Sequence, residues 1–146
     1  MNKIFGTSTL HWLSAKSRDK VIGAALSNGF SQFDTAGVYG LGATNKYLGS
    51  LGLSKNISFS AKLGLTSAKT IGFSRSEVLL RKIIFSRASK IEEDDCYSSW
   101  QRQFETQMKD LGVCKVQRLL LHERLINKKI WQLFQKFINE YKAHFD

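Results

Sequence analysis

The sequence predicts an α/β fold in which parallel strands alternate with helices. Short apolar runs alternate along the chain with longer segments whose apolar residues recur every three or four positions. Several of these longer segments end at a glycine, a residue that often follows the last turn of a helix. The predicted order is strand, helix, strand, helix, strand, long loop, helix, strand and helix. This order is expected when helical crossovers join parallel strands.

Local signals mark the ends of the elements predicted in the first half of the chain. Ser17 is the expected N-cap of the first helix, and Asn28 with Gly29 is its expected stop. The segment ISFSAK alternates between apolar and polar residues, which is typical of a strand. In chain order this half contains the strand 4–10, the helix after Ser17, the strand 30–34, the helix 45–51 and the strand 57–62.

The second half contains one poorly patterned stretch followed by three clear elements. Residues 65–95 carry glycine and serine clusters and predict a long basic loop, with a short helix near 77–85. The next helix has Phe104, Met108 and Leu111 on one stripe and Gly112 as its stop. The elements after the loop are the helix 98–111, the strand 116–121 and the amphipathic helix 127–145.

Length and composition favour one domain, residues 1–146, with a buried core. No apolar run approaches the ~20 residues of a membrane-spanning helix, and no signal-peptide pattern is visible. We therefore expect no membrane partner and a cytoplasmic location. Cys96 and Cys114 are too few and too far apart for a disulfide framework or a zinc site, so we expect reduced thiols and no metal.

Part of the net charge of +10 lies in residues 62–90, where several lysines and arginines accompany a single acidic residue, Glu77. Such a surface attracts polyanions. However, no nucleic-acid motif and no interleaved aromatic residues accompany it, so we do not expect a nucleic-acid partner. We interpret the segment as a solvated basic loop. A milder alternative is that part of this charge faces a phosphate-bearing ligand.

Three predicted strands end in ionisable residues, namely Asp34, Lys62 and His122. Because the carboxyl ends of parallel strands lie at one edge of a sheet, these side chains are expected to converge there, with Tyr39 on the loop above. Each has a purely structural alternative. Asp34 would cap a turn, Tyr39 would be a lid residue, Lys62 a surface lysine and His122 a core histidine.

Three segments, in order, resemble the aldo-keto reductase family. FDTAGVYGLGATNKYLG is similar to its signature of Asp-Thr-Ala and Tyr-Gly followed by a Leu-Gly helix. FSAKLG resembles the strand that carries the active-site lysine of the family. QFETQMKDLGVCKVQRLLLHE resembles the helix and the strand that precede the active-site histidine of the family. The resemblance implies a TIM-type parallel (β/α) barrel. Because such a barrel needs about 250 residues, this chain would be truncated to about four β/α units.

The resemblance also implies the chemistry, which is NADPH-dependent reduction of an aldehyde or ketone, including that of a sugar, to an alcohol. Tyr39 would give the carbonyl oxygen its proton, and the Lys62 ammonium would stabilise the resulting phenolate. Asp34 would pair with Lys62, and His122 would orient the substrate carbonyl. The match to the cofactor site is weaker and comprises Gly6, Thr7, Ser8 and Asp34.

Some residues depart from the family pattern. Asn45 occurs where the family usually has Glu, and Gln107 where it usually has Ser; Gln117 and Arg124 replace a usual Asp and Pro.

A half-barrel would also leave strand edges open, so we expect self-association as one way to cover them. Two alternatives to an active reductase stay open. One is a catalytically degenerate relative that acts as a binding or regulatory subunit or has no independent activity, and the other is an unrelated basic binding module.

Overall fold

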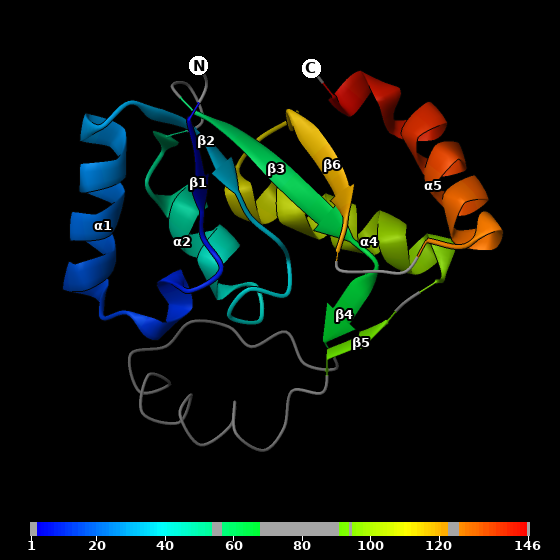
Figure 1. The fold of residues 1–146 in the computed structure, drawn as a ribbon, viewed down its shortest axis with the longest axis horizontal. Coiled ribbons are helices and arrows are strands. Elements are labelled where there is room, and N and C mark those ends of the chain that lie inside the picture. Colours follow the sequence, from blue (N-terminus) through cyan, green and yellow to red (C-terminus); the bar gives the residue numbers. More distant parts are fainter. Residues whose placement is uncertain (1–2, 54–56, 68–90, 94, 123–125, 146) are drawn as a thin grey trace.

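Four parallel strands form the central sheet of the molecule. The computed structural model describes residues 3–53, 57–67, 91–93, 95–122 and 126–145. The strands are β1 (Lys3–Gly6), β2 (Phe30–Asp34), β3 (Ser58–Leu63) and β6 (Arg118–Leu121), and they lie side by side in that order (Figure 1). Successive strands are therefore neighbours, as in a (β/α) barrel, but the sheet does not close. The predicted parallel α/β fold is confirmed.

The helices bury one face of this sheet. Figure 1 shows α2 and α4 behind the strands, and α1 and α5 at the two sides. The interface contains the large buried side chains of Phe33, Phe59, Trp100, Phe104 and Phe137. The helices are α1 (Ala15–Ser27), α2 (Ala43–Ser50), α4 (Tyr97–Leu111) and α5 (Lys128–Tyr141), with short 3₁₀ helices η1 (Leu10–Trp12) and η3 (Lys142–His144).

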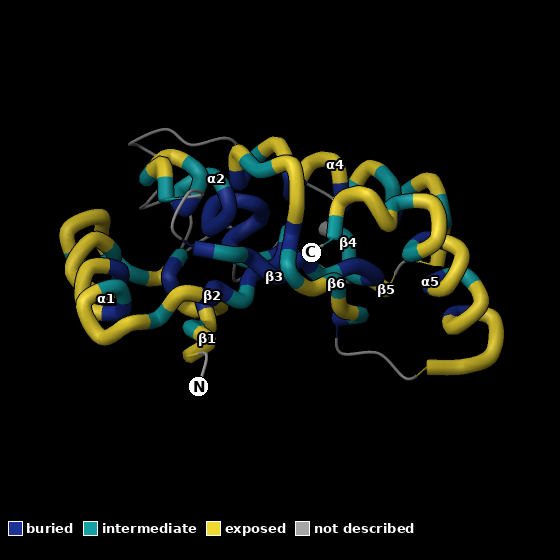
Figure 2. The backbone as a smooth tube through the Cα atoms, turned by 90° about the horizontal axis from the view of Figure 1, so that it is seen from above, coloured by how far each residue is buried: buried dark blue, intermediate teal, exposed yellow. Residues whose placement is uncertain are grey.

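The opposite face of the sheet carries the candidate site residues. Lys62 pairs with Leu120 across β3 and β6, so both side chains lie on this face. Alternation along the ladder puts Ile4 on the same face. Ile4 is 40% and Leu120 39% exposed, because the described helices lie on the other side of the strands (Figure 2). In the part of the chain that the structure describes, this face is open at the outer strands, whereas Gln32 and Ser60 on the central strands are buried.

Several predicted bounds need correction: α2 begins at Ala43 rather than 45, β6 begins at Arg118 rather than 116, and α5 ends at Tyr141 rather than 145. Two further corrections concern the N-terminal elements. The first strand spans Lys3–Gly6 rather than 4–10, because the chain leaves the sheet after Gly6 and turns into η1. The first helix begins at Ala15, and its N-cap is Ser14 instead of Ser17. The Ser14 side chain accepts a hydrogen bond from the Ser17 backbone N–H at 3.2 Å, so Ser17 already lies within the first turn.

A two-stranded antiparallel sheet joins the two ends of the predicted loop 65–95. It consists of β4 (Leu65–Ser67) and β5 (Ile91–Glu93), with Leu65 opposite Glu93. Strands of three residues are too short to show an alternating pattern, so the sequence did not predict them. The helix expected at 77–85 lies outside the described residues.

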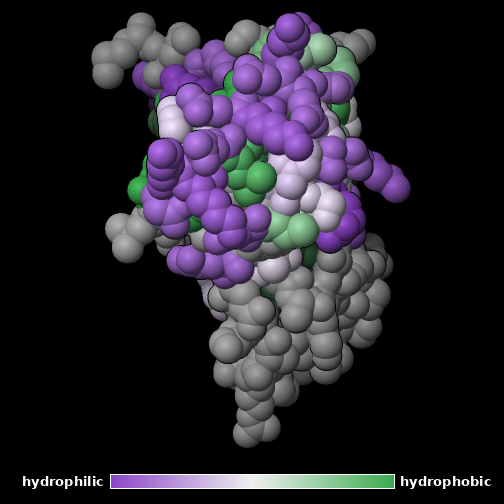
Figure 3. Space-filling view, turned by 90° about the vertical axis from the view of Figure 1, so that its right-hand side faces the viewer, coloured by the Kyte–Doolittle hydropathy of each residue, from purple (hydrophilic) through white to green (hydrophobic). Residues whose placement is uncertain are grey.

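The last two long helices pack through aromatic rings. Phe104 of α4 contacts Phe137 of α5 edge-on at 5.6 Å between ring centres, and Phe137 stacks on Tyr141 at 4.4 Å. As predicted, Gly112 ends α4 in the left-handed conformation, with φ = 67°. The surface on the α5 side is mainly hydrophilic, as expected for an amphipathic helix, with a small hydrophobic area near its centre (Figure 3). Among the described helices, none is both long and apolar enough to cross a membrane.

Candidate active site

Strand β2 ends at Asp34, on the open face of the sheet. Its last pairing partners are Gly6 of β1 and Ser60 of β3. The main-chain oxygen of Asp34 accepts hydrogen bonds from the Thr7 hydroxyl at 2.9 Å and from the Thr7 N–H at 3.1 Å. These contacts hold the carboxylate at the carboxyl end of the sheet.

The loop after β2 carries Tyr39 and has an unusual backbone. Gly40, Leu41 and Gly42 all adopt positive φ, at 59°, 55° and 86°. Positive φ is uncommon for leucine, and such residues concentrate at functional loops. A Cβ atom at Gly40 would lie 2.5 Å from His11 Cβ, so the loop needs glycine there. This conformation determines where the preceding Tyr39 ring lies.

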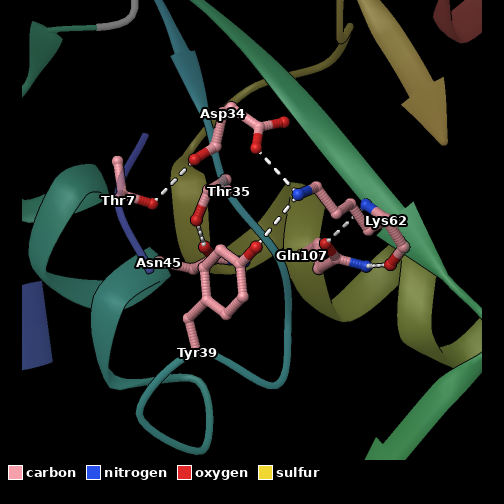
Figure 4. Close-up of polar contacts among 7 residues, drawn as sticks. All are labelled: Thr7, Asp34, Thr35, Tyr39, Asn45, Lys62 and Gln107. Atoms are coloured by element: carbon pink, nitrogen blue, oxygen red, sulfur yellow. Dashed lines mark hydrogen bonds and ion pairs between the residues drawn. The ribbon is translucent and has the colours of Figure 1, made fainter. Parts of the chain in front are cut away.

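A buried hydrogen bond ties the start of this loop to α2. The Thr35 hydroxyl donates to Asn45 Oδ1 at 2.6 Å, and Asn45 is fully buried (Figure 4). The sequence identified Asn45 only as a departure from the family pattern. In the structure it fastens the loop that carries Tyr39.

Lys62 of β3 connects Asp34 and Tyr39. Its Nζ atom lies 2.7 Å from Asp34 Oδ2 and donates a hydrogen bond to the Tyr39 hydroxyl oxygen at 2.9 Å (Figure 4). Partial burial by itself would lower the pKa of Lys62, but the hydrogen bonds to Asp34 and Tyr39 outweigh it and raise the pKa above its ordinary value. The side chain is therefore a charged ammonium at neutral pH.

His122 follows β6 and lies beside Tyr39. Its ring centre is 5.5 Å from that of Tyr39, and the two rings are perpendicular. The His122 backbone N–H donates to Leu63 O at 2.9 Å, which continues the β3–β6 ladder, and the residue is buried. The structure thus brings together the four residues that the sequence assigned to one rim of the sheet. Their catalytic roles stay predictions.

The weaker cofactor candidates lie at the end of β1. Gly6 pairs with Asp34, Thr7 is fully buried and Ser8 is exposed. A Cβ atom at Gly6 would meet no atom within 4 Å, so there is open space beside the strand end. The assignment of these residues to a cofactor stays a prediction.

A cavity of about 330 Å³ lies against Lys62 and His122. The loop after β2, strand β4 and one side of α4 form its other walls. Its lining is mostly polar on the α4 side, where burial raises the pKa of Asp110. The α4 side chains in the wall are Ser99, Arg102, Gln103, Thr106, Gln107 and Asp110.

Gln107, which departs from the family pattern, contacts the backbone of Lys62. Its amide Nε2 donates to Lys62 O at 2.9 Å, and its Oε1 accepts from the Lys62 N–H at 3.3 Å. A signal was present in the sequence, because Gln107 lies between apolar residues on the buried side of an amphipathic helix. Buried polar side chains usually have partners.

Comparison with known proteins shows the family and the fold of the chain. The sequence model described as the Aldo/keto reductase family matches residues 4–143. The chain therefore belongs to the aldo/keto reductase family, and the predicted family is confirmed. A comparison with curated proteins gave no significant match.

Solved structures of aldo-keto reductases share the fold. A glycerol dehydrogenase from Gluconobacter oxydans has 19% sequence identity and a TM-score of 0.67, with 97% of this chain and 42% of that chain covered. An aldo-keto reductase from Bacillus halodurans in its holo form has 16% identity and a TM-score of 0.67, with 93% and 41% covered. One from Klebsiella pneumoniae in complex with NADPH has 19% identity and a TM-score of 0.55, with 95% and 42% covered. This chain spans less than half of each of the three.

Proposed function

We propose that this chain carries the proton-transfer site of an NADPH-dependent carbonyl reductase that converts an aldehyde or ketone to an alcohol. Membership of the aldo/keto reductase family supports an oxidoreductase. The observation that carries the proposal is the pair of contacts of Lys62 Nζ, 2.7 Å to the Asp34 carboxylate and 2.9 Å to the Tyr39 hydroxyl.

Each of the four residues has one step in this proposal. Tyr39 donates its hydroxyl proton to the carbonyl oxygen of the substrate. A phenol is a weak acid near neutral pH, so the adjacent Lys62 ammonium assists by stabilising the phenolate that forms. Asp34 keeps Lys62 charged and directed at Tyr39. His122, beside the Tyr39 ring, donates a hydrogen bond to the same carbonyl oxygen and orients it.

The residues at the end of β1 fit the nicotinamide end of a cofactor. When bound, the reduced nicotinamide supplies the hydride. The open space at Gly6 would admit a flat ring beside Asp34, and the exposed Ser8 would offer a hydroxyl. The Thr7 hydroxyl already donates to Asp34 O, so Thr7 would act by holding Asp34. The NADPH named for the Klebsiella pneumoniae structure supports this choice of cofactor.

The substrate that we propose is a small polar carbonyl compound or the corresponding alcohol. Hydroxyl and amide groups in the wall of the cavity beside Lys62 and His122 would accommodate hydroxyl groups of a sugar or polyol. The structural similarity to a glycerol dehydrogenase is consistent with such a substrate.

We also propose that the chain self-associates and works in the cytoplasm. Strands β1 and β6 are at the edges of the described sheet, and Ile4 and Leu120 are exposed on its open face. Covering these groups with another chain would bury apolar surface and sheet edges. Sedimentation at several protein concentrations tests this. The sequence has two cysteines, Cys96 and Cys114, too few for a disulfide framework, and this supports a reducing compartment.

One observation favours a second candidate function, which is a catalytically degenerate relative that binds a partner or has no independent activity. The sequence departs from the family pattern at Asn45, Gln107, Gln117 and Arg124. A relative that keeps the proton-transfer groups without affinity for the cofactor would fold without reducing carbonyl compounds.

Two measurements test the proposed function. Titration with NADPH, followed by tryptophan fluorescence, should show saturable binding, and a panel of aldehydes should give NADPH oxidation. Tyr39→Phe should lower kcat by about 100-fold or more and leave NADPH affinity unchanged. The matched control is Tyr47→Phe, because the Tyr47 hydroxyl contacts Asp19 instead of Lys62.

The possible outcomes separate the candidates. Normal turnover in Tyr39→Phe would mean that the proton donor is misassigned. A folded wild-type chain with no affinity for NADPH would favour the degenerate relative instead.

A further inference from the structure

Strand β3 extends beyond its neighbour β2, and this leaves peptide groups of Lys62 without a strand partner on that side. The β2–β3 ladder ends with Asp34 opposite Ser60, whereas β3 continues to Leu63. Leu63 O accepts from the His122 N–H on the β6 side. Because the peptide groups of consecutive strand residues point to opposite sides, those of Lys62 point toward the gap beyond β2.

The side-chain amide of Gln107 fills this gap. Its Nε2 donates to Lys62 O at 2.9 Å and its Oε1 accepts from Lys62 N at 3.3 Å (Figure 4). One glutamine therefore satisfies both peptide groups of Lys62, which in a continuing parallel ladder would bond to two residues of the neighbouring strand. A serine, which the family resemblance predicts at this position, has neither the length nor the second polar atom for these contacts.

The next glutamine along α4 repeats the contact on the following residue of that edge. Gln103 Oε1 accepts from the Gly64 N–H at 3.2 Å. Four helix residues rise by about 6 Å, and two strand residues by about 6.6 Å. The distance between Gln103 and Gln107 along α4 thus matches the distance between Gly64 and Lys62 along β3, so both glutamines can reach the edge of this strand.

Packing holds the Gln107 amide in this position. Gln107 is 2% exposed, and its Nε2 also donates to Gln103 O at 3.2 Å. On the other side, a Cβ atom at Gly37 would lie 3.2 Å from Gln107 Cγ, so the loop backbone packs closely against the side chain. Gln107 therefore has little freedom to leave the Lys62 backbone.

We propose that Gln107 is a positioning residue that fixes the Lys62 backbone, and through it the direction of the Lys62 ammonium toward Asp34 and Tyr39. The contact between the Gln107 amide and the Lys62 backbone does not depend on any reaction, whereas its effect on carbonyl reduction rests on the proposed function. Removing the amide lets the backbone of Lys62 shift at the end of β3. The ammonium then loses its close approach to both partners, 2.7 Å from Asp34 and 2.9 Å from Tyr39.

The test compares Gln107→Met with Gln103→Met by NMR on the full chain. Methionine has nearly the length of glutamine but no amide. In Gln107→Met, the amide hydrogen of Lys62 should exchange about tenfold faster, as expected for the loss of one hydrogen bond. The pKa of the Lys62 amine should also fall toward the ordinary lysine value. Gln103→Met removes the contact to Gly64 and should leave the Lys62 titration unchanged.

A specific result would overturn the proposal, namely a folded Gln107→Met variant in which Lys62 titrates as in the wild type. If this variant is too unstable for NMR, Gln107→Asn allows the same comparison, because its amide is one methylene too short to reach Lys62. The readout does not require turnover. A shifted Lys62 titration in a chain without reductase activity would support the positioning role and reject the proposed function.

Discussion

The ammonium nitrogen of Lys62 lies 2.9 Å from the hydroxyl oxygen of Tyr39, although the two residues belong to a strand and to a separate loop 23 positions away. The same nitrogen lies 2.7 Å from Asp34 Oδ2. One cation thus connects a carboxylate to a phenol on the open face of the sheet.

The ion pair between Asp34 and Lys62 should make stability depend on pH. Partial burial lowers the pKa of Lys62, but hydrogen bonds to Asp34 and Tyr39 raise it overall. The folded-state pKa is thus above the unfolded value, so this stabilisation is fully present below the ordinary lysine pKa and is lost as pH rises through the raised value. Asp34→Asn should cost about 1.5–3 kcal/mol at neutral pH, and less once Lys62 has lost its proton.

Urea unfolding from neutral to strongly alkaline pH measures this difference. Asp19→Asn is the control for the size of the loss at neutral pH, because the Asp19 carboxylate accepts from Tyr47 on an exposed surface. A cost of Asp34→Asn that stays constant across the whole alkaline range would contradict the linkage.

His122 should affect turnover without affecting the fold. In His122→Phe the ring against Tyr39 is retained, but the imidazole nitrogen that we propose to bind the substrate carbonyl is lost. We expect kcat to fall by about 10²–10³ with NADPH affinity unchanged. Steady-state kinetics and NADPH titration check this. His144→Phe, at a ring near the chain end that contacts Phe104, should leave both quantities unchanged.

The Tyr39 loop should not tolerate a side chain at Gly40. Gly40→Ala combines a positive φ, which costs about 1–2 kcal/mol, with a Cβ only 2.5 Å from His11 Cβ, an overlap that costs about 1–3 kcal/mol more. Gly52→Ala is the control, since Gly52 has φ = 63° but no atom within 4 Å of the added Cβ. Denaturant unfolding should therefore show a larger loss for Gly40→Ala. Equal losses would mean that the contact with His11 has no effect.

The Leu-Gly pair that ends the family-like motif has a packing role. A Cβ atom at Gly49 of α2 would lie 2.1 Å from Asp110 O, so the two helices cross in direct backbone contact. Gly49→Ala should cost about 1–3 kcal/mol or more. Gly23→Ala in α1 meets no atom within 4 Å and should instead stabilise the protein by about 0.5–1 kcal/mol. Thermal unfolding shifts of opposite sign are the expected result.

The elements with a clear local signal were predicted well. Strand β2 has the predicted bounds, Phe30–Asp34, because an apolar run followed by an acid defines both ends. Helix α5 begins at Lys128, one residue after the predicted start, and Asn127 caps it, since its side chain accepts from the Ile130 N–H. The predicted N-cap of α1 was wrong because both Ser14 and Ser17 have a hydroxyl side chain that can accept a hydrogen bond at a helix start. Only the backbone conformation selects Ser14.

The sequence by itself determined the parallel α/β fold and the convergence of Asp34, Lys62 and His122, because strand ends are local features and parallel strands end at one edge. The tertiary structure alone decided how these groups are held. Gln107 is 45 positions from Lys62, and whether its amide reaches that backbone depends on the separation of α4 and β3. Such separations result from the packing of side chains across an interface, for which no local pattern in the sequence exists.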